Sequence, residues 1–346
     1  MSEHKYAELA QKLREDIQSG FYTAGHKLPS ENELADMTGF SRQTVRQAIG
    51  ILEREGLANR IQGSGTYVRS PGFRREATRN IAVVTTYIGE YIFPFILHGI
   101  DEVLSRNGYT SMLSATRNRV DNERRILTEL LGKPIDGMIV EGTKTALPNP
   151  NIDLYEKIEQ AGIPVVFING FYPDLKRPVY VVADDLEGGS MACRSLLDKG
   201  HTHIAGIFKS DDIQGHRRYA GYTKALRIAG ITVRDDHVMW YTTENRDSML
   251  EACAMQILNG CTAVVCYNDE VALKVMEVLD EKGVSIPSKM ELASFDHSTI
   301  ARLSARPFLS LANPKESLGR VAAEKLLNLL KNRPQTPTVL PWSLIE

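Results

Sequence analysis

The sequence is poor in cysteine and lacks long apolar runs. Its four cysteines show no CxxC spacing among 346 residues, which predicts neither a disulfide framework nor a metal site. No apolar stretch is long enough to cross a bilayer, which excludes a transmembrane span. Residues 1–17 are charged from the third position and contain no apolar segment, which argues against a secretory signal. We therefore expect a cytoplasmic protein with reduced thiols in its core.

Sequence motifs of catalysis are also missing. No GxGxxG follows the first expected strand, and neither a Walker A motif nor a GxSxG elbow occurs. His201 and His203 have metal-like spacing, but no third ligand is near them in the sequence, so we interpret both as structural. The sequence therefore predicts no enzyme activity, no metal and no cofactor.

Positive and negative charges nearly balance over the whole chain. The formal net charge is −2, which by itself argues against binding to nucleic acid. Residues 40–79, however, contain eight arginines and only three glutamates, a local basic excess that is typical of phosphate contacts. Residues 69–79 combine proline, glycine and charge without periodicity and are interpreted as a linker. A solvated linker explains their arginines as well as a DNA contact does.

The first 68 residues predict three helices and a hairpin. An amphipathic helix over 5–20 is followed by a second helix, which begins at a capping box of Ser30 and Glu33. Ser41 caps a third helix, and residues 57–68 alternate around a glycine-rich turn. Two helices, a tight turn, a third helix and a hairpin make up a winged helix-turn-helix, an α+β fold.

The third helix carries cationic and amide side chains on one face. Arg42 and Arg46 are four residues apart in "SRQTVRQAI", and the apolar residues lie on the opposite face. In a helix-turn-helix this helix enters the major groove, where arginine reads guanine and glutamine reads adenine. We expect a base contact from Arg46, and base or phosphate contacts from Arg42 and Thr44. A solvated helix face is the alternative, and the flanking turn and wing favour DNA.

Residues 4–68 resemble the DNA-binding domain of the GntR regulators. The resemblance lies in "KLPSENELADMTGFSRQTVRQAIGILEREGL" followed by "QGSGTYV". Asn32 departs from the family, in which many members carry a basic residue that contacts DNA. With the residues already named, the resemblance implies a DNA-binding surface made of Lys5, Ser30, Glu31, Ser41, Arg42, Gln43, Thr44, Arg46, Gln62, Gly63 and Gly65.

The pattern changes from residue 80 onward. Apolar runs such as "IAVVTTY", "IDGMIVEG" and "TAVVCYND" alternate with amphipathic segments, for example over 94–107, 122–131, 186–199 and 268–282. Apolar strands that alternate with helices predict parallel α/β sheets. Residues 80–346 are too many for one modest sheet, so we expect two α/β lobes.

Polar and aromatic residues follow the expected strands of this segment. In open α/β sheets, ligands bind beyond the carboxyl ends of the strands, and groups of this kind bind sugar hydroxyls and ring faces. Asp184 and Asp269 could equally be helix caps. The expected effector-binding residues are Tyr87, Tyr91, Phe93, Glu141, Asn169, Lys209, Asp211, Arg218, Asn268, Asp269, Asp296 and His297.

Residues 80–346 resemble the effector domain of the LacI/GalR repressors, which shares its fold with periplasmic sugar-binding proteins. The resemblance lies in "GHTHIAGI", "HRRYAGY", "VVCYNDEVAL" and "LASFDHS". It places Arg218 at the arginine of the family motif RxxGF, and we expect Arg218 and Asp296 on strand-end loops. A GntR-type reader joined to this sensor resembles the bacterial arabinose repressors, and it implies L-arabinose as the effector.

The sequence therefore predicts a DNA-binding repressor that a sugar releases from its operator. One short reading helix contacts few bases, so we expect a homodimer on a near-palindromic operator. Three alternatives stay open: a sugar-binding transport protein, which would use the same lobes, a sugar-modifying enzyme, and a repressor that responds to another pentose or hexose.

Overall fold

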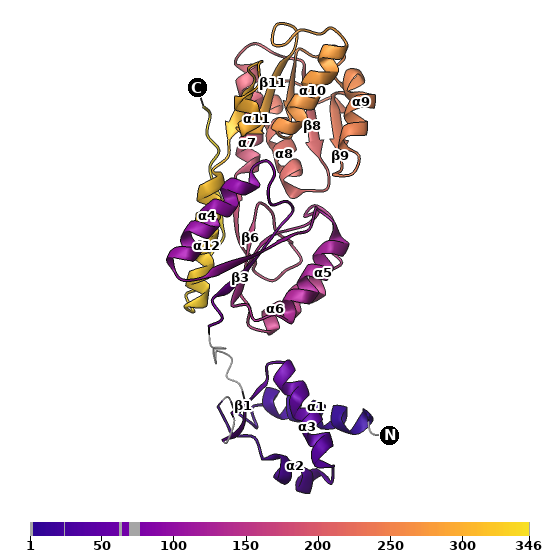
Figure 1. Ribbon diagram of the computed structural model, residues 1–346. Coiled ribbons are helices and arrows are strands. Elements are labelled where there is room, and N and C mark those ends of the chain that lie inside the picture. Colours follow the sequence, from indigo (N-terminus) through magenta and orange to yellow (C-terminus); the bar gives the residue numbers. More distant parts are fainter. Residues whose placement is uncertain (1–2, 24, 62–63, 69–76, 346) are drawn as a thin grey trace. The chain divides into compact units, whose positions relative to one another are not determined.

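The computed structural model describes residues 3–23, 25–61, 64–68 and 77–345. The chain divides into two compact units, the first made of residues 1–78 with 157–162, the second of 79–156 with 163–346 (Figure 1). Among the described residues, no helix combines the length and apolar character needed to span a membrane.

The first unit is the expected winged helix. Its elements are α1 (Glu3–Gln18), α2 (Glu31–Thr38), α3 (Arg42–Arg54), β1 (Ala58–Ile61) and β2 (Gly65–Val68). The two strands form an antiparallel hairpin, and the apolar faces of the three helices share one core that includes Leu13, Leu34, Ile49 and Val68.

The predicted helix caps of this unit are confirmed. The Ser30 hydroxyl accepts a hydrogen bond from the Glu33 backbone N–H, and the Glu33 carboxylate accepts one from Ser30 N–H, which completes the capping box. Gly39 ends α2 in the left-handed conformation, with a φ of 69°. The Ser41 hydroxyl accepts from the Thr44 N–H and so starts α3. Local hydrogen bonds thus fix the turn between α2 and α3.

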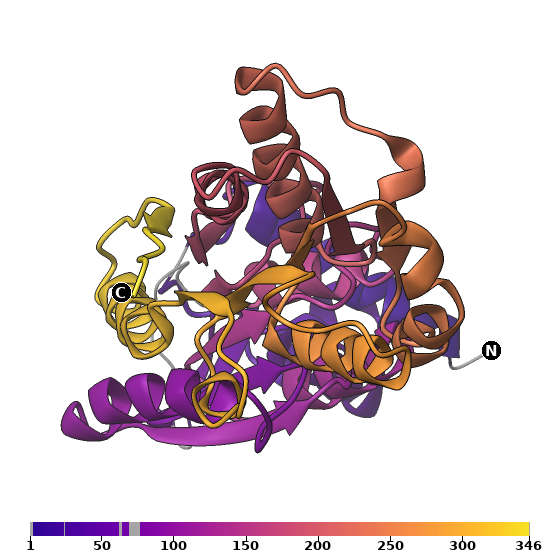
Figure 2. The same cartoon turned by 90° about the horizontal axis from the view of Figure 1, so that it is seen from above.

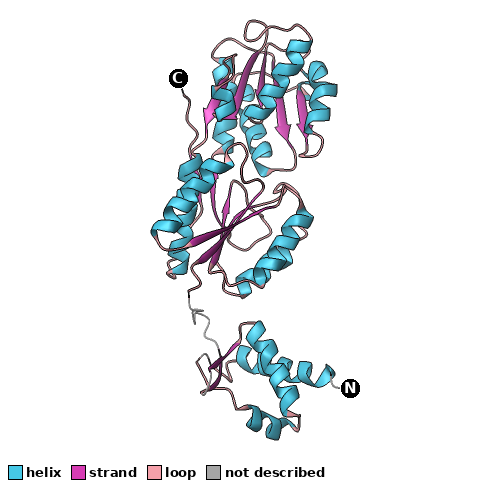
Figure 3. Cartoon of the chain, viewed as in Figure 1, coloured by secondary structure: helices cyan, strands magenta, loops and turns pink. Residues whose placement is uncertain are grey.

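The second unit contains two α/β lobes, each built on a sheet of parallel strands (Figures 1 and 3). The sheet of the first lobe has the order β13-β7-β6-β5-β3-β4, and all of its pairings are parallel. Its strands are β3 (Asn80–Thr85), β4 (Thr110–Ala115), β5 (Gly137–Glu141), β6 (Val165–Ile168), β7 (Val179–Ala183) and β13 (Thr338–Leu340). Its helices are α4 (Phe93–Arg106), α5 (Val120–Leu131), α6 (Ile152–Gln160) and α12 (Lys315–Leu330).

The second lobe has a five-stranded parallel sheet of order β12-β11-β10-β8-β9. Figure 2 shows helices on both sides of this sheet. Its strands are β8 (Ile204–Lys209), β9 (Val238–Tyr241), β10 (Ala263–Cys266), β11 (Glu291–Asp296) and β12 (Leu309–Ala312). Its helices are α7 (Asp185–Leu197), α8 (Ile213–Ile228), the short 3₁₀ helix η1 (Asp235–His237), α9 (Arg246–Ile257), α10 (Asp269–Glu281) and α11 (Thr299–Arg302).

The strands of the second lobe supply two cores because their side chains alternate. On β10, Val264 and Cys266 join the core beneath α9 and α10, whereas Ala263 and Val265 join the core beneath α7 and α8. Burial on both faces explains why these strands read as continuous apolar runs.

Paired glycines let two helix pairs approach closely, one pair in each lobe. A Cβ atom added at Gly319 on α12 would lie 2.1 Å from the Ile96 carbonyl oxygen on α4. A Cβ added at Gly221 on α8 would lie 2.0 Å from the Leu186 carbonyl oxygen on α7. Only glycine fits at these two crossings, because the obstructing atoms belong to the backbone.

Three strands have no counterpart in the sequence prediction: β9, β12 and β13. Each is only three or four residues long and carries one or more residues that are not buried. The α12 helix also returns to the first lobe after β12 has completed the sheet of the second, so the lobes are not contiguous in sequence.

Candidate functional site

The outer face of α3 presents the predicted polar side chains. Arg42, Gln43 and Arg46 are exposed, whereas Val45 and Ile49 on the inner face are fully buried. Ser30 and Ser41 use their hydroxyls as caps, and Thr44 bonds to the Ser41 hydroxyl at 2.9 Å. This face therefore offers side-chain donors from the first turns of a capped helix.

An acidic residue lies among these arginines. The Glu31 carboxylate accepts hydrogen bonds from Arg46 Nη2 at 2.7 Å and from Arg60 Nη2 at 2.8 Å. The hydrogen bond from Arg46 lowers the pKa of Glu31 below its ordinary value. Glu31 thus ties the third helix to the first strand of the wing and holds two guanidinium groups together. The "SRQTVRQAI" stretch contains no acid, and 15 residues separate Glu31 from Arg46.

Two of the other predicted DNA contacts, Lys5 and Gly65, lie within the described residues. The Lys5 ammonium lies 5.8 Å from the centroid of the Phe40 ring, in the turn between α2 and α3. Gly65 has a φ of 134°, and a Cβ there would lie 2.5 Å from the Lys27 side chain. Gln62 and Gly63 lie outside the described residues.

In the second unit, buried polar side chains gather where the strands of the two lobes end. Glu141, the last residue of β5, accepts hydrogen bonds from the Asn169 amide at 2.8 Å and from the Thr86 backbone N–H at 2.7 Å. Burial raises the pKa of Glu141 above its ordinary value, and these hydrogen bonds oppose the rise. Asn169 and Glu141 therefore lie together, as the sequence predicts.

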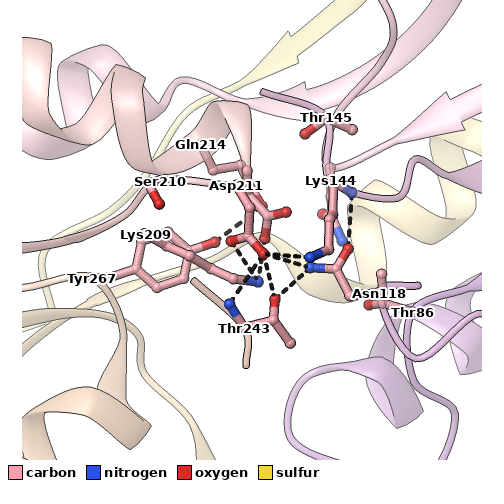
Figure 4. A network of polar contacts seen from close by, with 12 residues as sticks. Thr86, Asn118, Lys144, Thr145, Lys209, Ser210, Asp211, Gln214, Thr243 and Tyr267 are labelled. Carbon is pink, nitrogen blue, oxygen red and sulfur yellow. Dashed lines mark hydrogen bonds and ion pairs between the residues drawn. The ribbon is translucent and has the colours of Figure 1, made fainter. Parts of the chain in front are cut away.

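Asp211 is the centre of a second group, which joins the lobes (Figure 4). Its Oδ2 accepts hydrogen bonds from the Thr243 hydroxyl at 2.8 Å and the Thr243 N–H at 3.1 Å. Asn118 of the first lobe donates to the Thr243 hydroxyl at 2.6 Å, and the Lys144 ammonium lies 3.9 Å from Asp211 Oδ2. The Lys209 ammonium lies 3.8 Å from Asp211 Oδ1, which is buried and has no hydrogen-bond partner. An acceptor without a donor is therefore present in the network.

Tyr91 makes another contact between the lobes. Its hydroxyl donates to Asp296 Oδ2 at 2.6 Å, and the Asp269 backbone N–H donates to the same hydroxyl at 3.2 Å. Burial raises the pKa of Tyr91 well above its ordinary value, and the negative charge of Asp296 is the second cause of the rise.

Strained backbone accompanies these groups. Residues with positive φ that are not glycine include Tyr91 (56°), Asn118 (54°), Asn169 (60°), Asp296 (93°) and His297 (40°). Each left-handed residue of this kind costs about 1–3 kcal/mol, and such residues concentrate at functional sites.

The structure corrects the expected position of Arg218. It lies in the second turn of α8, not on a strand-end loop, and only 1% of its surface is exposed. Arg218 Nε donates to Asp185 at 2.9 Å, and Nη1 donates to the Tyr267 carbonyl. Burial raises the pKa of Asp185 to about 6, and the Arg218 charge opposes the rise. The RxxGF motif identifies the arginine but not the carboxylate that holds it.

The other predicted effector residues divide into site groups and structural groups. Asn268 caps α10 through the Val271 N–H, and Asp184 caps α7 through the Glu187 N–H, as expected of Asp184. Asp269 is no cap, because three serine hydroxyls surround its carboxylate, those of Ser294, Ser298 and Ser310. Phe93 is buried in the core beneath α4 and α12, with its ring 5.8 Å from that of Tyr87.

Sequence reasoning missed four members of these polar groups: Thr86, Asn118, Lys144 and Thr243. Asn118 follows β4, a strand after which no predicted site residue lies. Lys144 and Thr243 follow β5 and β9, at the same edges as the predicted residues, and β9 itself was not predicted.

The two histidines of "GHTH" lie away from these groups. One ring nitrogen of His201 bonds to the Thr262 hydroxyl at 2.9 Å and the other to Glu291 at 3.0 Å. His203 bonds to the neighbouring Thr202. In the part of the chain that the structure describes, no group of three His, Cys, Asp or Glu residues could hold a metal ion.

A winged helix joined to a two-lobed α/β unit defines the class of bacterial transcription regulators. Residues 5–68 match the family model of bacterial regulatory proteins of the gntR family, and residues 193–346 match that of a periplasmic binding protein-like domain. The solved transcriptional regulator CelR, in complex with cellobiose, has the same fold. It is 22% identical with a TM-score of 0.69, over 92% of this chain and 99% of that one.

Two relatives cover nearly the whole chain. The arabinose metabolism transcriptional repressor of Halalkalibacterium halodurans is 37% identical, over 95% of this chain and 90% of its own length. The repressor of the same name from Geobacillus stearothermophilus is also 37% identical, over 95% of this chain and 92% of its own length. The chain belongs to the family of arabinose metabolism transcriptional repressors.

Proposed function

We propose that this repressor binds operator DNA through its winged helix and binds L-arabinose between the lobes of its second unit. Binding of the sugar lowers the affinity for the operator, so that the repressor dissociates from it. The observation that carries the sugar site is the buried polar network at the strand ends, in which Asp211 Oδ1 accepts no hydrogen bond. A sugar hydroxyl is a donor that satisfies such an oxygen, and a buried acceptor left unpaired costs about 1–3 kcal/mol. The names of the two relatives support arabinose as the sugar. Because a repressor acts where the DNA lies, we place the protein in the cytoplasm.

Saturating L-arabinose is expected to weaken operator affinity about 5–150-fold, the usual range of allosteric coupling. It should also raise the unfolding temperature, because a ligand that binds only the native state stabilises it. Fluorescence anisotropy with operator DNA measures the first effect and a thermal-shift assay the second. D-arabinose is the matched control, since it has the same composition and the opposite configuration. A response to another pentose or hexose, with none to L-arabinose, would show that the effector is a different sugar.

Arg46→Ala is expected to cost about 1–3 kcal/mol at the operator and to relax the preference at one base position, as the loss of a bidentate base contact does. Lys5→Ala should weaken binding evenly across sequences, as the loss of a phosphate contact does. Titrations of both variants on operator and on random DNA compare the two. Equal losses for Arg46→Ala on the two DNAs would contradict the base-reading role.

We also propose that the repressor acts as a homodimer on a near-palindromic operator, because the few exposed side chains of one α3 helix can contact only a short half-site. Sedimentation at the working concentration is expected to give twice the chain mass of 38.6 kDa. Footprinting should protect two half-sites. A stable monomer that protects one half-site at full affinity would refute this proposal.

A further inference from the structure

Three chain segments link the two lobes of the second unit. They run from β7 into α7, from β12 into α12, and from β13 into the C-terminal residues 341–345. The Asp184 N–H donates to the Leu340 carbonyl at 2.8 Å, and the Ala312 N–H donates to the Ser343 carbonyl at 2.8 Å. The third segment therefore bonds to each of the other two, and any change in the angle between the lobes must pass through this bonded set.

Each linking segment places one side chain against a group of the proposed effector site. Asp185, on the first segment, accepts from Arg218 Nε at 2.9 Å. Asn313, on the second, donates to Asp296 Oδ1 at 3.0 Å. Trp342, on the third, lies with its ring 5.0 Å from the Arg218 guanidinium carbon. Arg218 is thus held from the first and third segments at once.

Trp342 holds Arg218 through its ring face and not through its N–H. The side chain is 5% exposed and lies edge to face with Phe295, with the ring centroids 5.2 Å apart. Its Nε1 is buried and has no hydrogen-bond partner. Tryptophan in a core normally satisfies that N–H. What this position uses is therefore a flat aromatic face over a buried cation, a favourable arrangement.

Gly188 reserves the space for this ring. A Cβ atom added at Gly188 on α7 would lie 2.7 Å from Trp342 Cδ1. The ring therefore contacts α7 and Arg218 while its own backbone continues from β13 in the sheet of the first lobe. Through the Trp342 side chain, the third linking segment packs into the core of the second lobe.

We infer that Trp342 is a positioning residue that couples the effector site to the angle between the lobes: it orients the Arg218 guanidinium from the third linking segment. This inference rests on the proposed function and on the prediction from the sequence that Arg218 binds the sugar. A sugar shifts the lobe equilibrium only if it binds the two arrangements with different affinity. The guanidinium carbon also lies 4.4 Å from the Phe295 ring and 4.7 Å from the Tyr267 ring, both in the second lobe. Trp342 supplies that difference, because it is the ring among the three that a change in the third segment moves.

The test compares Trp342→Leu, Trp342→Phe and the wild-type chain, with Trp240→Leu as the control. Trp240 also packs in the second lobe, but against Phe208, Tyr219 and His216. Two quantities are measured: the dissociation constant of L-arabinose, and the ratio of operator affinities without and with saturating L-arabinose. The unfolding midpoint and sugar-free operator binding of each variant report on folding.

Trp342→Leu is expected to lose most of the operator response, at least about fivefold in the affinity ratio, and to bind L-arabinose about tenfold more weakly. Trp342→Phe keeps an aromatic face and should stay within about twofold of the wild type in both. Trp240→Leu should lower the unfolding midpoint but leave the affinity ratio unchanged. If the role of Trp342 is merely structural, Trp342→Leu should lower the unfolding midpoint and leave the affinity ratio unchanged, as Trp240→Leu does.

Two outcomes would overturn this inference without affecting the proposed function. One is a sugar-responsive wild type beside an equally responsive Trp342→Leu. The other is an equal loss of response in Trp342→Leu and Trp342→Phe, which would show that the ring face is not what acts. A wild type that responds to no sugar overturns the proposed function, and the inference falls with it. The wild-type measurement therefore separates the two failures.

Discussion

Replacing Arg218 with alanine is expected to abolish the response to L-arabinose while the operator is still bound, which would give a permanently repressing protein. It is also expected to destabilise the second unit by about 3–5 kcal/mol, because Asp185 is left as a buried charge without a partner. Both groups of this ion pair are almost fully buried, with 1–2% of each side chain exposed. Operator titrations with and without sugar, and chemical denaturation, measure the two effects.

The double variant Arg218→Ala, Asp185→Asn separates sugar binding from stability. It removes the unpaired carboxylate and should recover most of the lost stability without recovering the sugar response. The pH gives a second control. Burial already raises the pKa of Asp185, and without Arg218 it should rise further. The stability loss of the single variant should therefore shrink as the pH falls and the carboxyl becomes neutral. A single variant that still responds normally to sugar would place Arg218 outside the site.

Replacing Glu123 with leucine is expected to destabilise the first lobe by several kcal/mol. The Glu123 carboxylate is fully buried on α5 and accepts hydrogen bonds from four side chains. These are Asn149 at 3.0 Å, Asn151 at 2.8 Å, Tyr155 at 2.8 Å and Tyr172 at 2.6 Å. Each buried donor left unpaired costs about 1–3 kcal/mol, so their sum is large against the stability of a domain.

The control for this change lies on the same helix. Glu129 is exposed and pairs with Arg125 one turn away. Glu129→Leu should alter the free energy of unfolding by no more than about 0.5 kcal/mol, as exposed substitutions usually do. Glu123→Leu should also weaken the sugar response. The Tyr172 hydroxyl, which donates to Glu123, also accepts from the Thr143 N–H, and the next residue, Lys144, contacts Asp211. Similar midpoints for the two variants would contradict the role given to Glu123.

The sequence by itself determined the winged helix almost completely. Its signals act over three or four residues: Ser30 with Glu33, Ser41 with Thr44, and a glycine at the end of α2. The same holds for most strands of the second unit, since strands buried on both faces must be apolar throughout. The polar residues at their ends were found because parallel strands align those ends at one edge of the sheet.

Tertiary structure alone decided which polar and charged groups meet. Glu31 lies 15 residues from Arg46, Asp185 lies 33 residues from Arg218, and Tyr91 lies 205 residues from Asp296. No local pattern encodes such pairs, because each forms only when elements distant in sequence are packed together. The return of α12 and β13 to the first lobe likewise depends on which parts of the first-lobe sheet the other elements leave uncovered. For this reason the sequence identified Arg218, but only the folded chain placed it beside Asp185 and Trp342, between two of the three segments that link the lobes.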